Sequence, residues 1–150
     1  MALLTKARTA QTVLCQEFYF NFDDTMVDTS GVTRDFGSLA AGSAAATVYT
    51  VVIGNLPPNA IVVGGSVVRS TAFDTAGYDV TVGDTAVTNR YLGSTDVKGT
   101  GLTALVPTGY QGAGENLVMT FSTDDACTTG AGVVRVEYII KDRVSEINTH

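Results

Sequence analysis

Tryptophan is absent from this sequence of 150 residues, and histidine occurs once, as the terminal residue His150. A general base needs a fixed geometry, whereas chain ends are usually frayed, so His150 is a poor candidate for catalysis. Catalytic triads and zinc sites that contain histidine are therefore not expected. Cysteine occurs twice, as Cys15 and Cys127, which is too few for a structural zinc site with four nitrogen or sulfur ligands. Two buried, reduced thiols are favoured over a disulfide between them.

Charge is also scarce, because charged residues make up 16% of the chain, well below the usual quarter. The formal net charge is −6, and nine lysines and arginines are scattered singly between Lys6 and Arg143. A protein that binds nucleic acid directly normally carries a basic patch, so no such partner is expected. Because charge is scarce, the surface is expected either to be rich in threonine, serine, asparagine and glycine or to be partly covered by other protein, since protein interfaces are depleted in charged residues at their centres.

Long apolar runs are missing too. The opening segment Met1–Arg8 has no apolar core long enough for a signal peptide, and no stretch approaches the length of a membrane span. We therefore expect synthesis in the cytoplasm and no membrane partner.

Period-two alternation is the strongest pattern that is present, and it predicts strands. Phe18, Phe20 and Phe22 share one face of the first strand, and Val134, Val136 and Tyr138 share one face of the last. Thr47–Ile53 is apolar on both faces, which predicts a central strand. The full set of predicted strands is Leu14–Phe22, Thr47–Ile53, Ala60–Val68 with a bulge at Gly64-Gly65, Tyr78–Val82, Ala86–Tyr91 as a weaker extended piece, Leu102–Val106, Asn116–Ser122 and Val133–Ile140.

Glycine, proline and asparagine turns separate these strands, and no window shows a convincing helical period. Two long gaps, Asp23–Ala46 and Leu92–Glu115, argue against a simple meander. The pattern predicts an all-β fold, a jelly-roll-like β-sandwich with Greek-key connections, long loops and an N-terminal arm. We expect an arm at 1–13, a single sandwich domain at 14–143 and a polar tail at 144–150.

Carboxylates are the only remaining candidates for chemistry. Calcium binding by loop carboxylates is one reading, and capping of turns at strand ends is the other; the absence of an Asp-x-Asp-x-Asp-Gly loop favours capping. Nothing in the spacing favours a pair of acids for glycoside hydrolysis. We therefore expect no enzyme and no catalytic, cofactor-binding or metal-binding residue. The residues weighed are Asp23, Asp24, Asp74, Asp79, Asp84, Asp124 and Asp125.

The glycine-rich segment Gly109–Gly114 has no following Lys-Ser/Thr and no helix behind it, so it is read as a loop and not as a phosphate site. The aromatic run around Phe18 has no basic residue beside it, which favours core packing over single-strand nucleic-acid binding.

Three segments resemble tailed-phage capsid decoration proteins, also called cement proteins. They are Leu56–Gly65, Tyr78–Asp84 followed by Asn89–Leu92, and Gly130–Ile139, and the resemblance covers about residues 48–141. It implies a jelly-roll subunit on the outer surface of an icosahedral head, located in the virion. It also implies the major capsid protein as partner, whose subunits this chain would bridge and stabilise.

A dimer or trimer would gain avidity from many equivalent sites on such a shell. The arm Met1–Val13 and the segment Asp23–Ala46 are the candidates for reaching a neighbour, and both could equally lie over their own domain. Two alternatives stay open: another phage head or tail component, and a lectin-like carbohydrate-binding sandwich using the loop aromatics Tyr91 and Tyr110.

Overall fold

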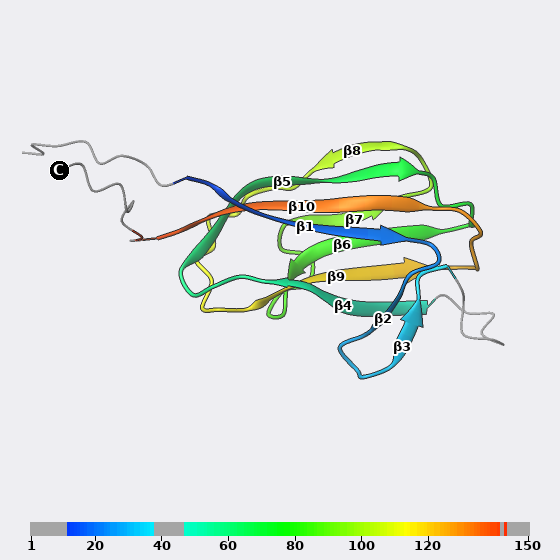
Figure 1. Cartoon of the computed structure of the whole chain (residues 1–150), viewed down its shortest axis with the longest axis horizontal. Coiled ribbons are helices and arrows are strands. Elements are labelled where there is room, and N and C mark those ends of the chain that lie inside the picture. The colour runs from blue at the N-terminus through cyan, green and yellow to red at the C-terminus, as the bar shows by residue number, and fades with distance from the viewer. Residues whose placement is uncertain (1–11, 38–46, 142, 144–150) are drawn as a thin grey trace, which may run out of the picture.

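The computed structural model describes residues 12–37, 47–141 and 143, and this part of the chain contains strands and no helix. Two four-stranded antiparallel sheets face each other, and a short hairpin projects beside them (Figure 1). The strands are β1 (Leu14–Asn21), β2 (Thr25–Val27), β3 (Thr33–Asp35), β4 (Thr47–Asn55), β5 (Ala60–Thr71), β6 (Tyr78–Asp84), β7 (Leu92–Asp96), β8 (Gly101–Ala104), β9 (Asn116–Thr123) and β10 (Ala131–Ile140).

The strand order is β1-β10-β5-β8 in one sheet and β4-β9-β6-β7 in the other, with β2 and β3 forming the hairpin. From β4 to β10 the chain changes sheet at almost every connection. Among these strands, only β6 and β7 follow each other in sequence and also pair with each other. The first and last strands of the sandwich pair with each other, Leu14 opposite Tyr138 and Asn21 opposite Ala131. This connectivity is that of the predicted jelly-roll-like β-sandwich.

Alternating apolar residues fill the space between the sheets, as the period-two pattern predicts. Phe20 is buried, Phe18 and Phe22 pack against the core, and the predicted inward faces of the later strands are buried as well. Those inward residues are Tyr78, Val80, Val82, Leu117, Met119, Phe121, Val134, Val136 and Tyr138.

The prediction of a central strand at Thr47–Ile53 was wrong, because β4 lies at the edge of its sheet. Its inward residues Tyr49 and Val51 are buried, but Val48 on the other face is 62% exposed. An apolar outer face therefore does not show that a strand is covered on both sides.

Three other segments differ from the prediction. Ala86–Tyr91 is a turn and not an extended piece, because the Asp84 carboxylate accepts the amides of Ala86 and Val87. The gap after Tyr91 contains β7, and the gap after Asn21 contains the hairpin β2–β3. The first and last segments predicted as arm and tail lie outside the described residues, apart from Thr12 and Val13.

The predicted bulge in β5 is confirmed. Glu137 pairs with Gly64 and Tyr138 pairs with Val62, so Val63 is the extra residue of β5. Gly65 has φ +133°, a conformation that side chains rarely adopt, and a Cβ there would lie 2.2 Å from the Arg135 carbonyl oxygen. Glycine at this position is therefore required by both backbone conformation and space.

We predict that Gly65→Ala lowers the free energy of unfolding by about 3 kcal/mol, because strain and overcrowding each cost on the order of 1–3 kcal/mol. Urea denaturation measures the change. Gly64→Ala is the matched control, since its Cβ would meet only the Glu137 side chain, with Oε2 nearest at 3.1 Å, and no backbone atom. Equal stability of the two variants would contradict the conclusion that glycine is required at position 65.

Candidate interaction surface

The hairpin β2–β3 projects from the sandwich and is the clearest candidate for contact with another protein (Figure 1). Thr25 pairs with Asp35 and Val27 with Thr33, so the five residues from Asp28 to Val32 form its turn. It lies within the segment Asp23–Ala46 that the sequence analysis proposed as a reaching element. The rest of that segment, residues 38–46, lies outside the described residues.

Asp28 organises this turn from inside. One carboxylate oxygen, Oδ1, accepts the backbone amides of Ser30 at 2.8 Å and Val32 at 3.0 Å. The other, Oδ2, accepts Nε of Arg34 at 2.6 Å, in an ion pair whose Asp28 side chain is only 2% exposed. The Val32 amide and the Arg34 guanidinium hold the pKa of the Asp28 carboxyl below its usual value. The turn is thus fixed before any partner arrives.

The hairpin is also anchored to the sandwich, both at its base and at its turn. Phe36, which directly follows β3, is 2% exposed and stacks on Phe121 at 4.7 Å. The hydroxyl of Tyr78 donates to the carbonyl of Phe36 at 2.7 Å, and the amide of Thr29 in the turn donates to the Thr50 carbonyl of β4. These contacts limit how far the hairpin can move, so its surface has a defined position.

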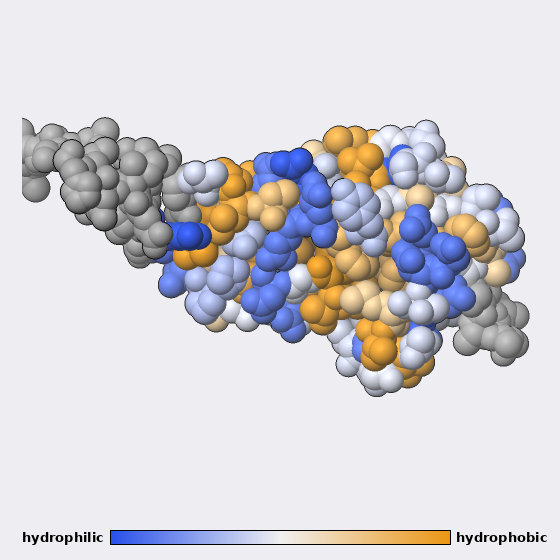
Figure 2. All heavy atoms as spheres, in the orientation of Figure 1, coloured by the Kyte–Doolittle hydropathy of each residue, from blue (hydrophilic) through white to orange (hydrophobic). Residues whose placement is uncertain are grey.

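Apolar side chains lie on the outside of this fixed hairpin. Val27 is 57% exposed and Val32 is 46% exposed. Figure 2 shows hydrophobic residues gathered on the protruding hairpin. An exposed apolar surface on a rigid turn loses little conformational entropy on binding, which favours docking against another protein.

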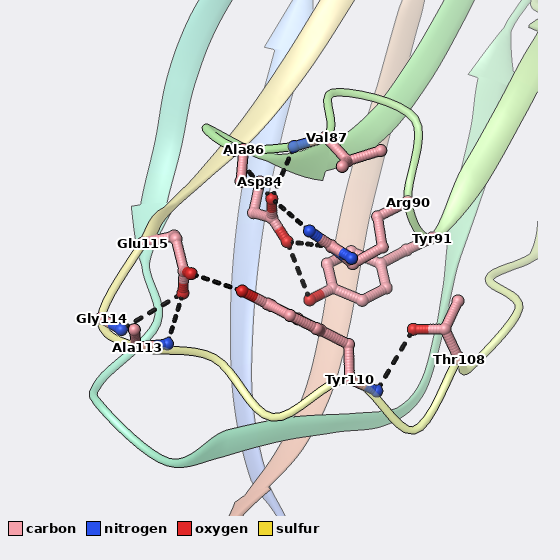
Figure 3. A network of polar contacts seen from close by, with 10 residues as sticks. All are labelled: Asp84, Ala86, Val87, Arg90, Tyr91, Thr108, Tyr110, Ala113, Gly114 and Glu115. Atoms are coloured by element: carbon pink, nitrogen blue, oxygen red, sulfur yellow. Dashed lines mark hydrogen bonds and ion pairs between the residues drawn. The ribbon is translucent and has the colours of Figure 1, made fainter.

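A second polar network lies where the loop before β9 meets the turn after β6 (Figure 3). Asp84 is buried at 1% exposure and forms an ion pair with Nε of Arg90. The Arg90 guanidinium lies 3.6 Å from the centre of the Tyr110 ring, and the Tyr110 hydroxyl donates to Glu115 at 2.7 Å. These contacts connect the glycine-rich segment Gly109–Gly114 to the turn after β6.

Three other aspartates that were weighed for calcium binding, Asp24, Asp74 and Asp125, accept hydrogen bonds at strand ends and in loops, the arrangement favoured over calcium binding. Asp24 accepts the amide of Asn21, and Asp125 accepts the amide of Ala126. Asp74 accepts the amides of Thr128 and Thr129 and the Thr128 hydroxyl, which lower its carboxyl pKa to about 2. Within the described residues, no three His, Cys, Asp or Glu side chains are grouped to hold a metal ion.

The two cysteines have different environments. Cys127 is buried as predicted, and burial raises the pKa of its thiol to about 11, which makes it a poor nucleophile. Cys15 was predicted to be buried but is exposed, because it lies on the outward face of β1. Both thiols are free. His150 lies outside the described residues, and the described residues form no helix that could cross a membrane.

The loop aromatics proposed for sugar stacking are occupied by internal contacts. Tyr91 was expected to be exposed in a loop, but it is 2% exposed, and its hydroxyl faces the Asp84 carboxylate at 3.4 Å. The Tyr110 ring carries Arg90 on one face. The carbohydrate alternative therefore loses Tyr91 as a platform and keeps at most the other face of Tyr110.

We predict that Asp28→Ala frees the amides of Ser30 and Val32, which should then exchange with solvent at least about tenfold faster, as expected when a local hydrogen-bonded turn opens. Amide exchange followed by NMR measures this. The Phe36 amide, which donates to the Asp24 carbonyl, is the internal control and should keep its rate. Unchanged exchange at Ser30 and Val32 would show that Asp28 does not organise the turn.

We predict that Asp84→Ala lowers the free energy of unfolding by about 3 kcal/mol or more, because the change leaves the Arg90 guanidinium and two amides without their buried acceptor. Asp23→Ala, at an exposed position with no hydrogen bond or ion pair in the described structure, should change stability by less than about 0.5 kcal/mol. Denaturant titration compares the two. A loss at Asp84 no larger than at Asp23 would refute the role of the network.

Two comparisons by sequence found nothing: no protein-family model matches the chain, and no curated protein matches it. Two solved structures share its fold. One is a chain of the cyanophage Pam1 capsid asymmetric unit, with TM-score 0.54, 17% identity, and coverage of 93% of this chain and 97% of that one. The other is a chain of the capsid of Ralstonia phage GP4, with TM-score 0.53, 15% identity, and coverage of 95% and 93%. The described sandwich is therefore a fold that also occurs, over nearly the whole length of the chain, in phage capsids.

Proposed function

We propose that this protein is a structural virion protein that binds the outer surface of a phage head. It bridges neighbouring major capsid protein subunits and stabilises the shell, after synthesis in the host cytoplasm. The observation that carries the proposal is the match in fold along nearly the whole chain to chains of two phage capsids. A more general role as another head or tail component is the alternative within the same class.

The hairpin β2–β3 is the proposed contact with the shell. Its turn is pre-ordered by Asp28, its base is fixed by Phe36 in the core, and its exposed surface is apolar at Val27 and Val32. A pre-organised apolar element binds with a smaller entropic cost than a flexible loop. Weak contacts of this kind suffice when an oligomer, a dimer or trimer, engages several equivalent sites at once.

Co-sedimentation with expanded shells that lack the protein tests this function. We expect binding that saturates at a fixed ratio of this chain to the major capsid protein. Shells with the protein bound should also withstand heating better than bare shells, because a ligand that binds only the assembled state stabilises it. Absence of binding at micromolar concentrations would refute the proposal.

We predict that Val27→Asp weakens shell binding at least about tenfold, because it replaces an apolar contact by a charge that must be desolvated. Leu102→Asp is the matched control, since Leu102 has a similar exposure of 63% but lies on β8, away from the hairpin. Quantitative co-sedimentation measures both. Equal binding by the two variants would exclude the hairpin as the contact.

A further inference from the structure

The free edge of β1 is the feature that the proposed shell contact does not use. Among the four edge strands of the two sheets, β7 and β8 have only five and four residues. β4 is interrupted by a register shift between Val52 and Gly54 and accepts the Thr29 amide at Thr50. By contrast, β1 pairs with β10 over eight residues without a bulge, and it contains no proline. Such an edge is a template for pairing with another strand.

The hydrogen-bond pattern shows which groups of β1 point outward. The Phe22 amide donates to the Gly130 carbonyl at 2.9 Å, in line with the β10 register. Hydrogen-bonded pairs alternate along an antiparallel ladder. The amide and carbonyl groups of the even-numbered residues of β1 therefore point toward β10, and those of the odd-numbered residues point away from it, toward the free edge. Asn21 is already satisfied, because its amide donates to Asp24 Oδ2 and its carbonyl accepts the Asp24 amide.

Three residues remain with outward main-chain groups, namely Cys15, Glu17 and Tyr19. In the described part of the structure, their outward amides and carbonyls have no partner. Between them lies Phe18, whose side chain points to the inner face and is only partly buried against the core. A strand placed along β1 would satisfy the main-chain groups and cover the exposed part of Phe18.

We propose that β1 pairs antiparallel with β1 of a second copy of this chain, with Phe18 opposite Phe18 on the two-fold axis. Glu17 of each copy then lies opposite Tyr19 of the other, and each such pair exchanges two main-chain hydrogen bonds. The first sheet thereby continues across both copies.

The residues of β1 select this register over its neighbours. A two-fold axis at Glu17 would place the two Glu17 carboxylates directly opposite each other, and like charges in that position are destabilising. An axis at Tyr19 would place Glu17 opposite Asn21, whose main-chain groups are already bonded to Asp24. With the axis at Phe18, the Tyr19 hydroxyl, which bonds Glu17 within one chain at 3.2 Å, also has a glutamate opposite it. Because β1 is complementary to itself in this register, we assign a second copy of this chain as the strand that pairs with it.

The dimer would supply the multivalency on which the proposed function rests, but its test needs only the isolated protein. NMR measures the exchange rate of each backbone amide of β1, under reducing conditions that prevent a disulfide through Cys15. The amides of Glu17 and Tyr19 should exchange at least tenfold more slowly than that of Cys15, which faces Asn21 and gains no acceptor. Dilution should remove this protection, because it separates the copies.

A proline variant tests whether the copies associate through β1, with the mass of the assembly as the measurement. Glu17→Pro removes one outward amide from each copy and is compatible with an edge strand, since the lost amide does not face β10. Light scattering should give twice the chain mass for the wild type, and at least tenfold weaker association for Glu17→Pro. Glu17→Thr keeps the amide and should remain dimeric.

A monomer at concentrations of tens of micromolar, with Glu17 and Tyr19 amides exchanging as fast as Cys15, would overturn the proposal. A dimer that Glu17→Pro leaves intact would overturn it too, because the copies would then meet elsewhere. Protection of these amides only after shells are added would assign the edge to a capsid strand instead. A dimer that ignores shells would refute the proposed function and leave this inference standing.

Discussion

Aromatic packing around Phe121 joins parts of the molecule that are far apart in sequence. Its ring lies 5.9 Å from Phe20 of the opposite sheet, 5.2 Å from Tyr49, 6.0 Å from Tyr78 and 4.7 Å from Phe36 at the base of the hairpin. Aromatic pairs contribute about 0.5–1.5 kcal/mol each beyond the burial of their surface. Both the closure of the sandwich and the position of the hairpin therefore depend on the same cluster.

The main strands could be predicted from the sequence because burial in a sandwich imposes alternation on every strand that covers the core. Leu14–Asn21, Asn116–Thr123 and Ala131–Ile140 follow this rule, and their inward residues are identified correctly. β2, β3 and β7 could not be found, because they have only three, three and five residues and bury few apolar side chains. β2 and β3 pair with each other and β7 pairs with β6, so these strands are defined by their pairing and not by a pattern of burial.

The contact surface was harder to predict than the fold. The segment Asp23–Ala46 was identified from its length, but nothing local distinguishes Asp28 as the organiser of a turn from the other aspartates. That role depends on Arg34, which lies six residues later and reaches Asp28 only once the hairpin has formed. In the same way, the burial of Tyr91 follows from the buried Asp84 beside it and not from the loop composition around it.

The pairing of β1 with β10 determines how the sandwich responds to mechanical force. Both strands have their outer ends at Leu14 and Tyr138, while β1 leads to the hairpin at its other end. A force that separates Leu14 from Tyr138 breaks the ladder one bond at a time, as in unzipping. A force between Leu14 and Ala131, which lie on different strands at opposite ends of the ladder, pulls β1 along β10 and strains the whole ladder at once. Tension applied through Leu14 and Ala131 would therefore be resisted far better than tension applied through the neighbouring ends Leu14 and Tyr138.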